Sequence, residues 1–191
     1  MPGTTHMSAA VVIPPQEIWR PIQAIRARYD RHVTRWMPHI TMALPFRCKE
    51  EFPSLVPLLK EGCAGLQPFA VELAAVRFFD HGGERYTLWL DPEPMKPLQE
   101  LQEAMARVLP DCNDVRLYEF GFTPHLSVGQ ANGRENMEKL LKKLQADWTP
   151  LRFTVWEVSL VWRDRPPEDT FRVGATFPIG AGRAGTAIGD C

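Results

Sequence analysis

One short pattern occurs twice in this chain and constrains its fold more than any other feature of the sequence. Residues 36–44 read WMPHITMAL and residues 122–130 read FTPHLSVGQ. Both contain Pro-His, an aliphatic residue, a hydroxyl residue and another apolar residue. A single His-x-Thr is a weak signal, but this longer agreement is difficult to obtain twice by chance. His125 lies 86 positions after His39, which suggests that a whole structural unit is repeated.

The elements expected around the motif repeat in the same order. Apolar periodicity predicts strand, helix, motif strand, helix and strand, and then this order again. Phe69 and Phe153, 84 positions apart, are a second pair of landmarks with nearly the same offset. The segment DHGGER predicts a hairpin, because Gly82 and Gly83 tolerate positive φ. The expected strands are 9–14, 39–46, 69–79, 85–92, 122–130, 151–163 and 170–177, and the expected helices are 16–33, 50–63, 95–109 and 134–146.

The repeat predicts the fold class. A duplicated unit that buries one face of its sheet against its twin forms two pseudo-symmetric lobes, and equivalent strands then face one another across the groove. We therefore expect an α+β fold in which antiparallel sheets line a central cleft. Residues 9–178 should form one domain, with lobes of approximately 9–80 and 84–178 between which strands can be exchanged. Residues 1–8 are expected to be a disordered leader and residues 179–191 a flexible glycine-rich tail.

Charge and apolar content exclude several classes of protein. The 22 Lys and Arg residues nearly balance the 23 Asp and Glu residues, which argues against a protein that holds long nucleic acid by bulk positive charge. No segment is long and apolar enough to cross a membrane, and no signal peptide is recognisable. The four cysteines lack a C-x-x-C pair, so neither a zinc knuckle nor a disulfide framework is indicated. We expect a cytoplasmic monomer that needs no cofactor.

The two motifs predict a phosphodiester-cleaving site. In a strand, His39 points to the same side as Thr41, and His125 to the same side as Ser127. If the two motif strands meet, one neutral histidine can accept a proton while the other, protonated, donates one. The two hydroxyl groups can donate hydrogen bonds to phosphate oxygens. No metal is expected, because the nearest further ligand candidates lack a suitable spacing.

Other side chains on or near the expected inner strands are weaker candidates for substrate contacts. Aromatic rings in such positions can stack on a nucleobase, and arginines at strand ends can contact a phosphate or a base. These candidates are Phe46, Tyr86, Trp89 and Trp162 among the aromatic residues and Arg85 and Arg163 among the arginines.

PHITM and PHLSV resemble the paired H-x-[ST]-x motifs of the 2H phosphoesterase superfamily, which includes the bacterial RNA 2',3'-cyclic phosphodiesterases, also called 2'-5' RNA ligases. The resemblance covers residues 9–177. It implies two α+β lobes around a groove, with His39 and His125 as the catalytic pair and Thr41 and Ser127 as phosphate ligands. Ser127 departs from the threonine that is commoner at its position. The motifs identify the superfamily but separate its substrate branches poorly.

The leading hypothesis is a metal-independent phosphodiesterase that hydrolyses 2',3'-cyclic phosphate termini of short RNA or nucleotides. One alternative keeps the chemistry and changes the substrate to 2',5'-oligoadenylates or another cyclic nucleotide. Another is a binding module that holds RNA ends without cleaving them. The sequence does not assign the acid and the base, because the two halves of the site are near-equivalent.

Overall fold

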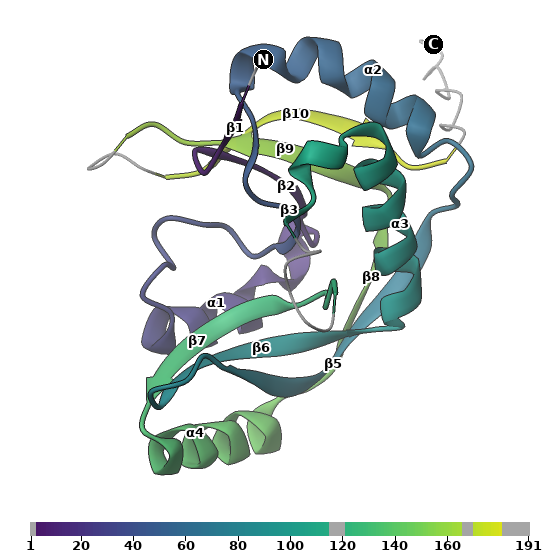
Figure 1. Cartoon of the computed structure of the whole chain (residues 1–191). Coiled ribbons are helices and arrows are strands. Elements are labelled where there is room, and N and C mark those ends of the chain that lie inside the picture. Colours follow the sequence, from purple (N-terminus) through teal and green to yellow (C-terminus); the bar gives the residue numbers. More distant parts are fainter. Residues whose placement is uncertain (1–2, 115–120, 166–169, 181–191) are drawn as a thin grey trace, which may run out of the picture.

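Two four-stranded antiparallel sheets lie one above the other and are joined along one side (Figure 1). The computed structural model describes residues 3–114, 121–165 and 170–180. In sheet order, the first sheet contains β10 (Arg172–Pro178), β9 (Glu157–Trp162), β2 (Ser8–Val12) and β3 (Ile40–Ala43). The second contains β7 (Leu126–Asn132), β6 (Arg85–Glu93), β5 (Phe69–Asp80) and β8 (Leu151–Val155). The α+β class and the antiparallel sheets expected from the sequence are confirmed.

The two halves of the chain exchange strands. β5, from the first half, pairs with β6 of the second half along the predicted hairpin, so it belongs to the second sheet. In return, β9 from the second half pairs with β2 and completes the first sheet. The sheet orders β3-β2-β9-β10 and β7-β6-β5-β8 therefore correspond position by position. Phe69 and Phe153, in contrast, lie on the adjacent strands β5 and β8, so they are not equivalent landmarks of the two units.

The single strand expected at 151–163 is wrong, because this segment forms two strands. β8 pairs with β5 in the second sheet, whereas β9 pairs with β2 and β10 in the first. The chain passes from one sheet to the other at Trp156, whose side chain is half exposed. The pairing of this segment with the one at 170–177 is confirmed, since β9 and β10 are antiparallel neighbours.

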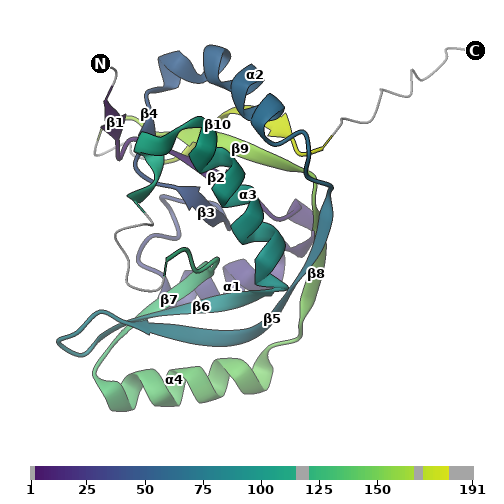
Figure 2. The ribbon, with the colours of Figure 1, turned by 45° about the vertical axis from the view of Figure 1, so that its right-hand side comes forward.

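Among the described residues, four α-helices cover the sheets (Figures 1 and 2). α2 packs on β10 and on α3, whereas α4 packs on β5 and β7, and α1 packs on β7. Each helix presents apolar residues to a shared core that includes Ile22, Leu59, Leu98 and Leu144, as the sequence periodicity predicts. The helix bounds are α1 (Trp19–Tyr29), α2 (Phe52–Gly62), α3 (Met95–Val108) and α4 (Arg134–Asp147).

Both motif strands lie at the edges of their sheets, and β3 contacts β7. The strand expected at 39–46 is interrupted at Leu44 and Pro45, after which β4 (Phe46–Arg47) begins. A proline cannot donate a hydrogen bond to a neighbouring strand, which explains the interruption. His39 and His125 each stand immediately before the first residue of their strand.

Several boundaries differ from those expected. Thr4 and Thr5 fall within the expected disordered leader but form β1 (Thr4–Thr5) and pair with β4. Ser8, at the end of that leader, is a buried residue of β2. The first helix ends at Tyr29 instead of near residue 33, because Asp30 adopts an extended conformation. Of the expected tail, residues 181–191 lie outside the described residues. Within the described ranges, no helix is long and apolar enough to cross a membrane.

Candidate active site

The two motif histidines lie near each other. They stand at the starts of β3 and β7, which are in contact, and His125 is close enough for its charge to lower the pKa of His39. Each histidine is partly exposed as a residue, although its ring is buried deeply enough for burial to lower its pKa. The expectation that the two half-sites meet between the sheets therefore agrees with this geometry.

Each imidazole makes an equivalent hydrogen bond to a backbone carbonyl oxygen two residues before it. His39 Nδ1 lies 2.7 Å from the carbonyl oxygen of Met37, and His125 Nδ1 lies 2.8 Å from that of Thr123. A carbonyl oxygen can only accept, so Nδ1 carries the proton in both rings. In the neutral form Nε2 is then unprotonated and can act as a base, and in the charged form it can donate a proton.

The surroundings of His39 favour its neutral form. Its pKa is lowered from 6.5 to about 4, chiefly because burial disfavours the charged imidazolium. The hydrogen bond to Met37 opposes this effect, whereas the positive charges of Arg26 and His125 add to it.

The pKa of His125 is lowered in the same direction. Burial is again the main cause, the hydrogen bond to Thr123 opposes it, and the charge of His81 adds to it. Without a ligand, both rings are therefore mostly neutral at pH 7. A bound phosphate would raise both pKa values, because an anion stabilises an imidazolium beside it.

A parallel stack of aromatic rings supports His39. The Trp36 ring lies 4.4 Å from the His39 ring at an interplanar angle of 23°, and 3.5 Å from the Phe171 ring at 17°. The loop that carries Trp36 is fastened to the segment of Phe171 by a 2.8 Å hydrogen bond from Phe171 N to the carbonyl oxygen of Arg35. The guanidinium of Arg163 lies over the outer ring, 5.2 Å from its centroid.

The rings around His125 are arranged differently. Phe79 and Trp89 stack on each other at 4.8 Å and 23°. His125 is nearly perpendicular to Phe79, at 4.9 Å and 87°, and steeply inclined to Trp89, at 5.9 Å and 65°. The hydroxyl of Thr87 lies 2.9 Å from His81 Nε2. This side of the site belongs to β5, β6 and the hairpin that joins them.

The two hydroxyl residues of the motifs are partly exposed. Thr41 is opposite Val11 in the first sheet, and Ser127 is opposite Trp89 in the second. Directly opposed residues of an antiparallel pair point to the same face. Ser127 therefore shares a face with Trp89, whose ring packs near His125.

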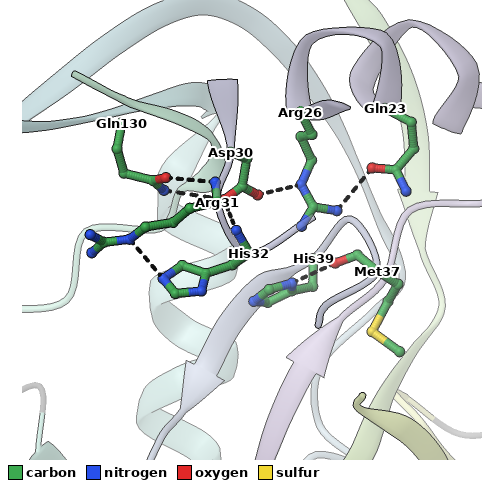
Figure 3. Close-up of polar contacts among 8 residues, drawn as sticks. All are labelled: Gln23, Arg26, Asp30, Arg31, His32, Met37, His39 and Gln130. Atoms are coloured by element: carbon green, nitrogen blue, oxygen red, sulfur yellow. Dashed lines mark hydrogen bonds and ion pairs between the residues drawn. The ribbon is translucent and has the colours of Figure 1, made fainter. Parts of the chain in front are cut away.

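A polar cluster centred on the buried Arg26–Asp30 pair ties the end of α1 to the second sheet (Figure 3). Arg26 Nε donates to Asp30 Oδ2 at 2.8 Å, and both side chains are almost completely buried. Asp30 Oδ1 accepts from the backbone N–H of His32 at 2.9 Å and from Gln130 Nε2 at 3.2 Å. Because Gln130 belongs to β7, this cluster links the end of α1, just before the first motif, to the strand that carries the second.

The weaker candidates from the sequence are mostly elsewhere. Trp89 lies beside His125. Phe46 is in the core beside Phe52, and Tyr86 packs edge to face against Phe78. Trp162 lies under the cations of Lys49 and Arg172. Arg85 is exposed at the hairpin, where its Nε contacts the carbonyl oxygen of Gly82, and Arg163 is separated from His39 by the two stacked rings.

Sequence reasoning missed Trp36, Phe79 and the Arg26–Asp30 pair. One usable signal was present, since an aromatic residue stands three positions before each motif histidine, as Trp36 and Phe122. Phe122, however, packs against the main core. Phe79 comes from a strand far away in sequence, so only the pairing of β5 with β6 could reveal it.

Potential metal ligands are scattered over the part of the chain that the structure describes. Among those residues, no group of three or more His, Cys, Asp or Glu side chains is arranged to hold a metal ion. The groups that the described residues bring to the site are the two imidazoles, the two hydroxyls and the polar groups around them.

Known proteins resemble this chain in sequence and in fold. Residues 14–167 match the model of the 2'-5' RNA ligase superfamily. A candidate phosphoesterase of Halalkalibacterium halodurans is 31% identical over 121 residues, which are 63% of this chain and 67% of that protein. Two solved structures share the fold at low sequence identity. TT0787 of Thermus thermophilus has a TM-score of 0.58 and 18% identity, over 92% of this chain and 99% of that one. LigT of E. coli in complex with phosphate has a TM-score of 0.56 and 15% identity, over 94% and 100%.

Proposed function

Because this chain belongs to the 2'-5' RNA ligase superfamily, and is thus related to phosphoesterases, we propose that it is a metal-independent phosphodiesterase that opens 2',3'-cyclic phosphate ends of short RNA or nucleotides. The observation that carries the proposal is the matched pair of imidazoles, each with Nδ1 on a carbonyl oxygen and Nε2 left for proton transfer. E. coli LigT, of the same fold, has been solved with phosphate and with 3'-AMP, and these ligands suit a site for phosphorylated nucleotide ends.

The proposed reaction is general acid–base hydrolysis. The neutral histidine accepts a proton from a water molecule as the water oxygen attacks phosphorus. The bond from phosphorus to one ribose oxygen breaks, and the protonated histidine donates its proton to that oxygen. The product is a phosphomonoester beside a free hydroxyl group. Thr41 and Ser127 donate hydrogen bonds to the non-bridging oxygens, which keep their negative charge through the transition state.

Binding of the substrate favours the protonated histidine that acts as the general acid. Because burial lowers the pKa of both histidines, the free site carries little imidazolium at pH 7. The phosphodiester anion favours protonation of one ring when it binds between the two. One chain supplies both half-sites, which supports the prediction that a monomer is sufficient.

A panel of substrates in excess chelator tests the proposal. Nucleoside 2',3'-cyclic phosphates, 2',5'-linked oligoadenylates and 3',5'-cyclic nucleotides would be compared, and the first group should be hydrolysed fastest. His39→Ala and His125→Ala should each lower kcat by about 10²–10⁴-fold, and Thr41→Val and Ser127→Ala by about 10–10³-fold. His6→Ala is the matched control, because His6 is exposed.

Three results would count against the proposal. Full activity of either histidine variant would exclude two-histidine catalysis. Preference for 2',5'-linked oligoadenylates would keep the chemistry and change the substrate. Saturable binding of a cyclic-phosphate oligonucleotide without any product would instead indicate a binding module.

A further inference from the structure

The two sides of the site differ in one respect that the repeated motif does not predict. On the His39 side, Trp36 lies nearly parallel to both the imidazole and Phe171. Two near-parallel neighbours at 4.4 and 3.5 Å occupy both faces of the indole. No face of Trp36 is therefore left to stack on a ligand.

On the His125 side, among the residues that the structure describes, Phe79 has a near-parallel ring neighbour on one face only, because it stacks on Trp89 whereas the rings of His125 and His81 are inclined to it. The ring centroids of Phe79, Trp89 and His125 form a triangle with sides of 4.8, 4.9 and 5.9 Å. If His125 continued the stack beyond Phe79, it would lie much farther from Trp89 than it does. The imidazole is instead beside the stack. The ring of His81 lies 6.4 Å from that of Phe79 at an interplanar angle of 56°, so it does not stack on Phe79 either. Phe79 is partly exposed.

Phe79 belongs to the same wall as the second half-site. Phe79 stacks on Trp89, and Trp89 is opposite Ser127 in the sheet. A ligand phosphate held by Ser127 and His125 would therefore have Phe79 as its neighbouring aromatic surface. Trp89 is buried beneath it and fixes the orientation of the Phe79 ring.

We propose that Phe79 stacks on the nucleobase of the substrate, so that the base lies on the β5–β6 side of the site, beside His125, and not beside His39. This inference rests on the proposed function and adds the direction in which a nucleotide binds. Stacking on an aromatic ring is tolerant of base identity, so Phe79 should contribute similarly to binding of all four bases.

The test combines ligand binding with two kinds of substrate. Affinity for 3'-AMP is measured by calorimetry, and KM and kcat are measured for a nucleoside 2',3'-cyclic phosphate and for ribose 2',3'-cyclic phosphate, which has no base. Phe79→Leu, which keeps an apolar side chain of similar volume, should weaken 3'-AMP binding about tenfold. It should raise KM for the nucleoside substrate by a similar factor, with kcat nearly unchanged, and leave the base-free substrate unaffected. Phe79→Tyr should retain wild-type values.

Phe78→Ala is the matched control. Phe78 precedes Phe79 in β5, points to the opposite face and packs against Tyr86. It should bind 3'-AMP as the wild type does, although it removes a ring of the same size.

The outcomes separate this inference from the proposed function. The base subsite would be overturned if Phe79→Leu bound 3'-AMP with wild-type affinity, or if the wild-type protein did not bind 3'-AMP at all. In either case, turnover of the base-free substrate would still measure the proposed hydrolysis. Equal losses on both substrates would also overturn it, because they would show a general defect of the site. Binding of 3'-AMP that depends on Phe79, without hydrolysis of any cyclic phosphate, would support the subsite and reject the proposed function.

Discussion

At the scale of residues, the proposed chemistry depends on how two histidines are held. The carbonyl oxygens of Met37 and Thr123 fix Nδ1–H in both rings, so the same nitrogen, Nε2, is offered from each side. The two rings nevertheless differ in their surroundings. Trp36 stacks flat on His39, whereas Phe79 and Trp89 meet His125 at steep angles.

A pH profile follows from the lowered pKa values. The productive free enzyme has one neutral and one protonated histidine, and this form is most populated between the two pKa values. Since both lie below 6.5, one of them at about 4, kcat/KM should be bell-shaped and peak below pH 6.5. The kcat optimum should lie at higher pH, because the bound anion raises the pKa of the imidazolium.

Steady-state kinetics between about pH 4 and pH 9 would measure both profiles. NMR titration of the imidazole protons, with and without inorganic phosphate, would measure the pKa values directly. A kcat/KM that peaks above neutral pH would contradict the lowered pKa values. Titrations that phosphate leaves unchanged would contradict an anion site between the rings.

At the scale of elements, the site depends on how α1 docks on β7. The last turn of α1 packs Tyr29 against Gly129, and the Asp30–Gln130 hydrogen bond follows directly. A Cβ atom at Gly129 would lie 2.7 Å from the Tyr29 Cβ atom and 3.2 Å from its carbonyl oxygen. The small residue after the second motif is therefore required by this close approach.

Gly129→Ala should lower the free energy of unfolding by about 1–3 kcal/mol, because the backbone of α1 must shift to make room. It should also lower kcat, since β7 carries Ser127 and His125 immediately precedes it. Gly65→Ala is the control, because a Cβ atom there would have no heavy atom within 4 Å. Urea unfolding and steady-state kinetics of both variants would test this, and equal stability of the two would contradict the close packing.

At the scale of the whole molecule, the exchanged strands make the two halves interdependent. The first sheet has β2 and β3 from the first half and β9 and β10 from the second, while β5 crosses in the other direction. Neither half contains a complete sheet. Each one alone would leave strand edges and apolar faces, such as that of Phe177, without a partner.

We therefore expect that the two fragments made by dividing the chain in the β5–β6 hairpin, 1–83 and 84–191, are each unfolded when alone. When the two fragments are mixed, they should restore activity. Circular dichroism and amide NMR of each fragment, and of the mixture, would measure this. The full chain cleaved at an inserted protease site in the same hairpin is the control, and it should remain folded. Cooperative unfolding of fragment 1–83 alone would contradict the exchange.

Local pattern was sufficient to predict most helices and the two motif strands, because periodicities of about 3.6 and 2 depend only on neighbouring residues. The sequence also contains a partial signal for the break between strands at Trp156. Polar residues alternate at Arg152 and Thr154 and then resume out of phase at Glu157 and Ser159. That change of phase is typical of a strand that changes sheet, but it does not indicate which sheet receives the next segment.

The sequence by itself determined the chemical groups, their spacing within each motif and the repetition that places two similar half-sites in one molecule. Only the tertiary structure decided that β5 and β9 exchange sheets, and with them whether Phe79, Tyr86 or Trp162 stands beside a histidine. The physical reason is that strand pairing uses the same backbone hydrogen bonds for every partner. Which strands pair therefore depends on how the side chains of both halves pack together. The alternation of polar and apolar residues within one strand does not predict that packing.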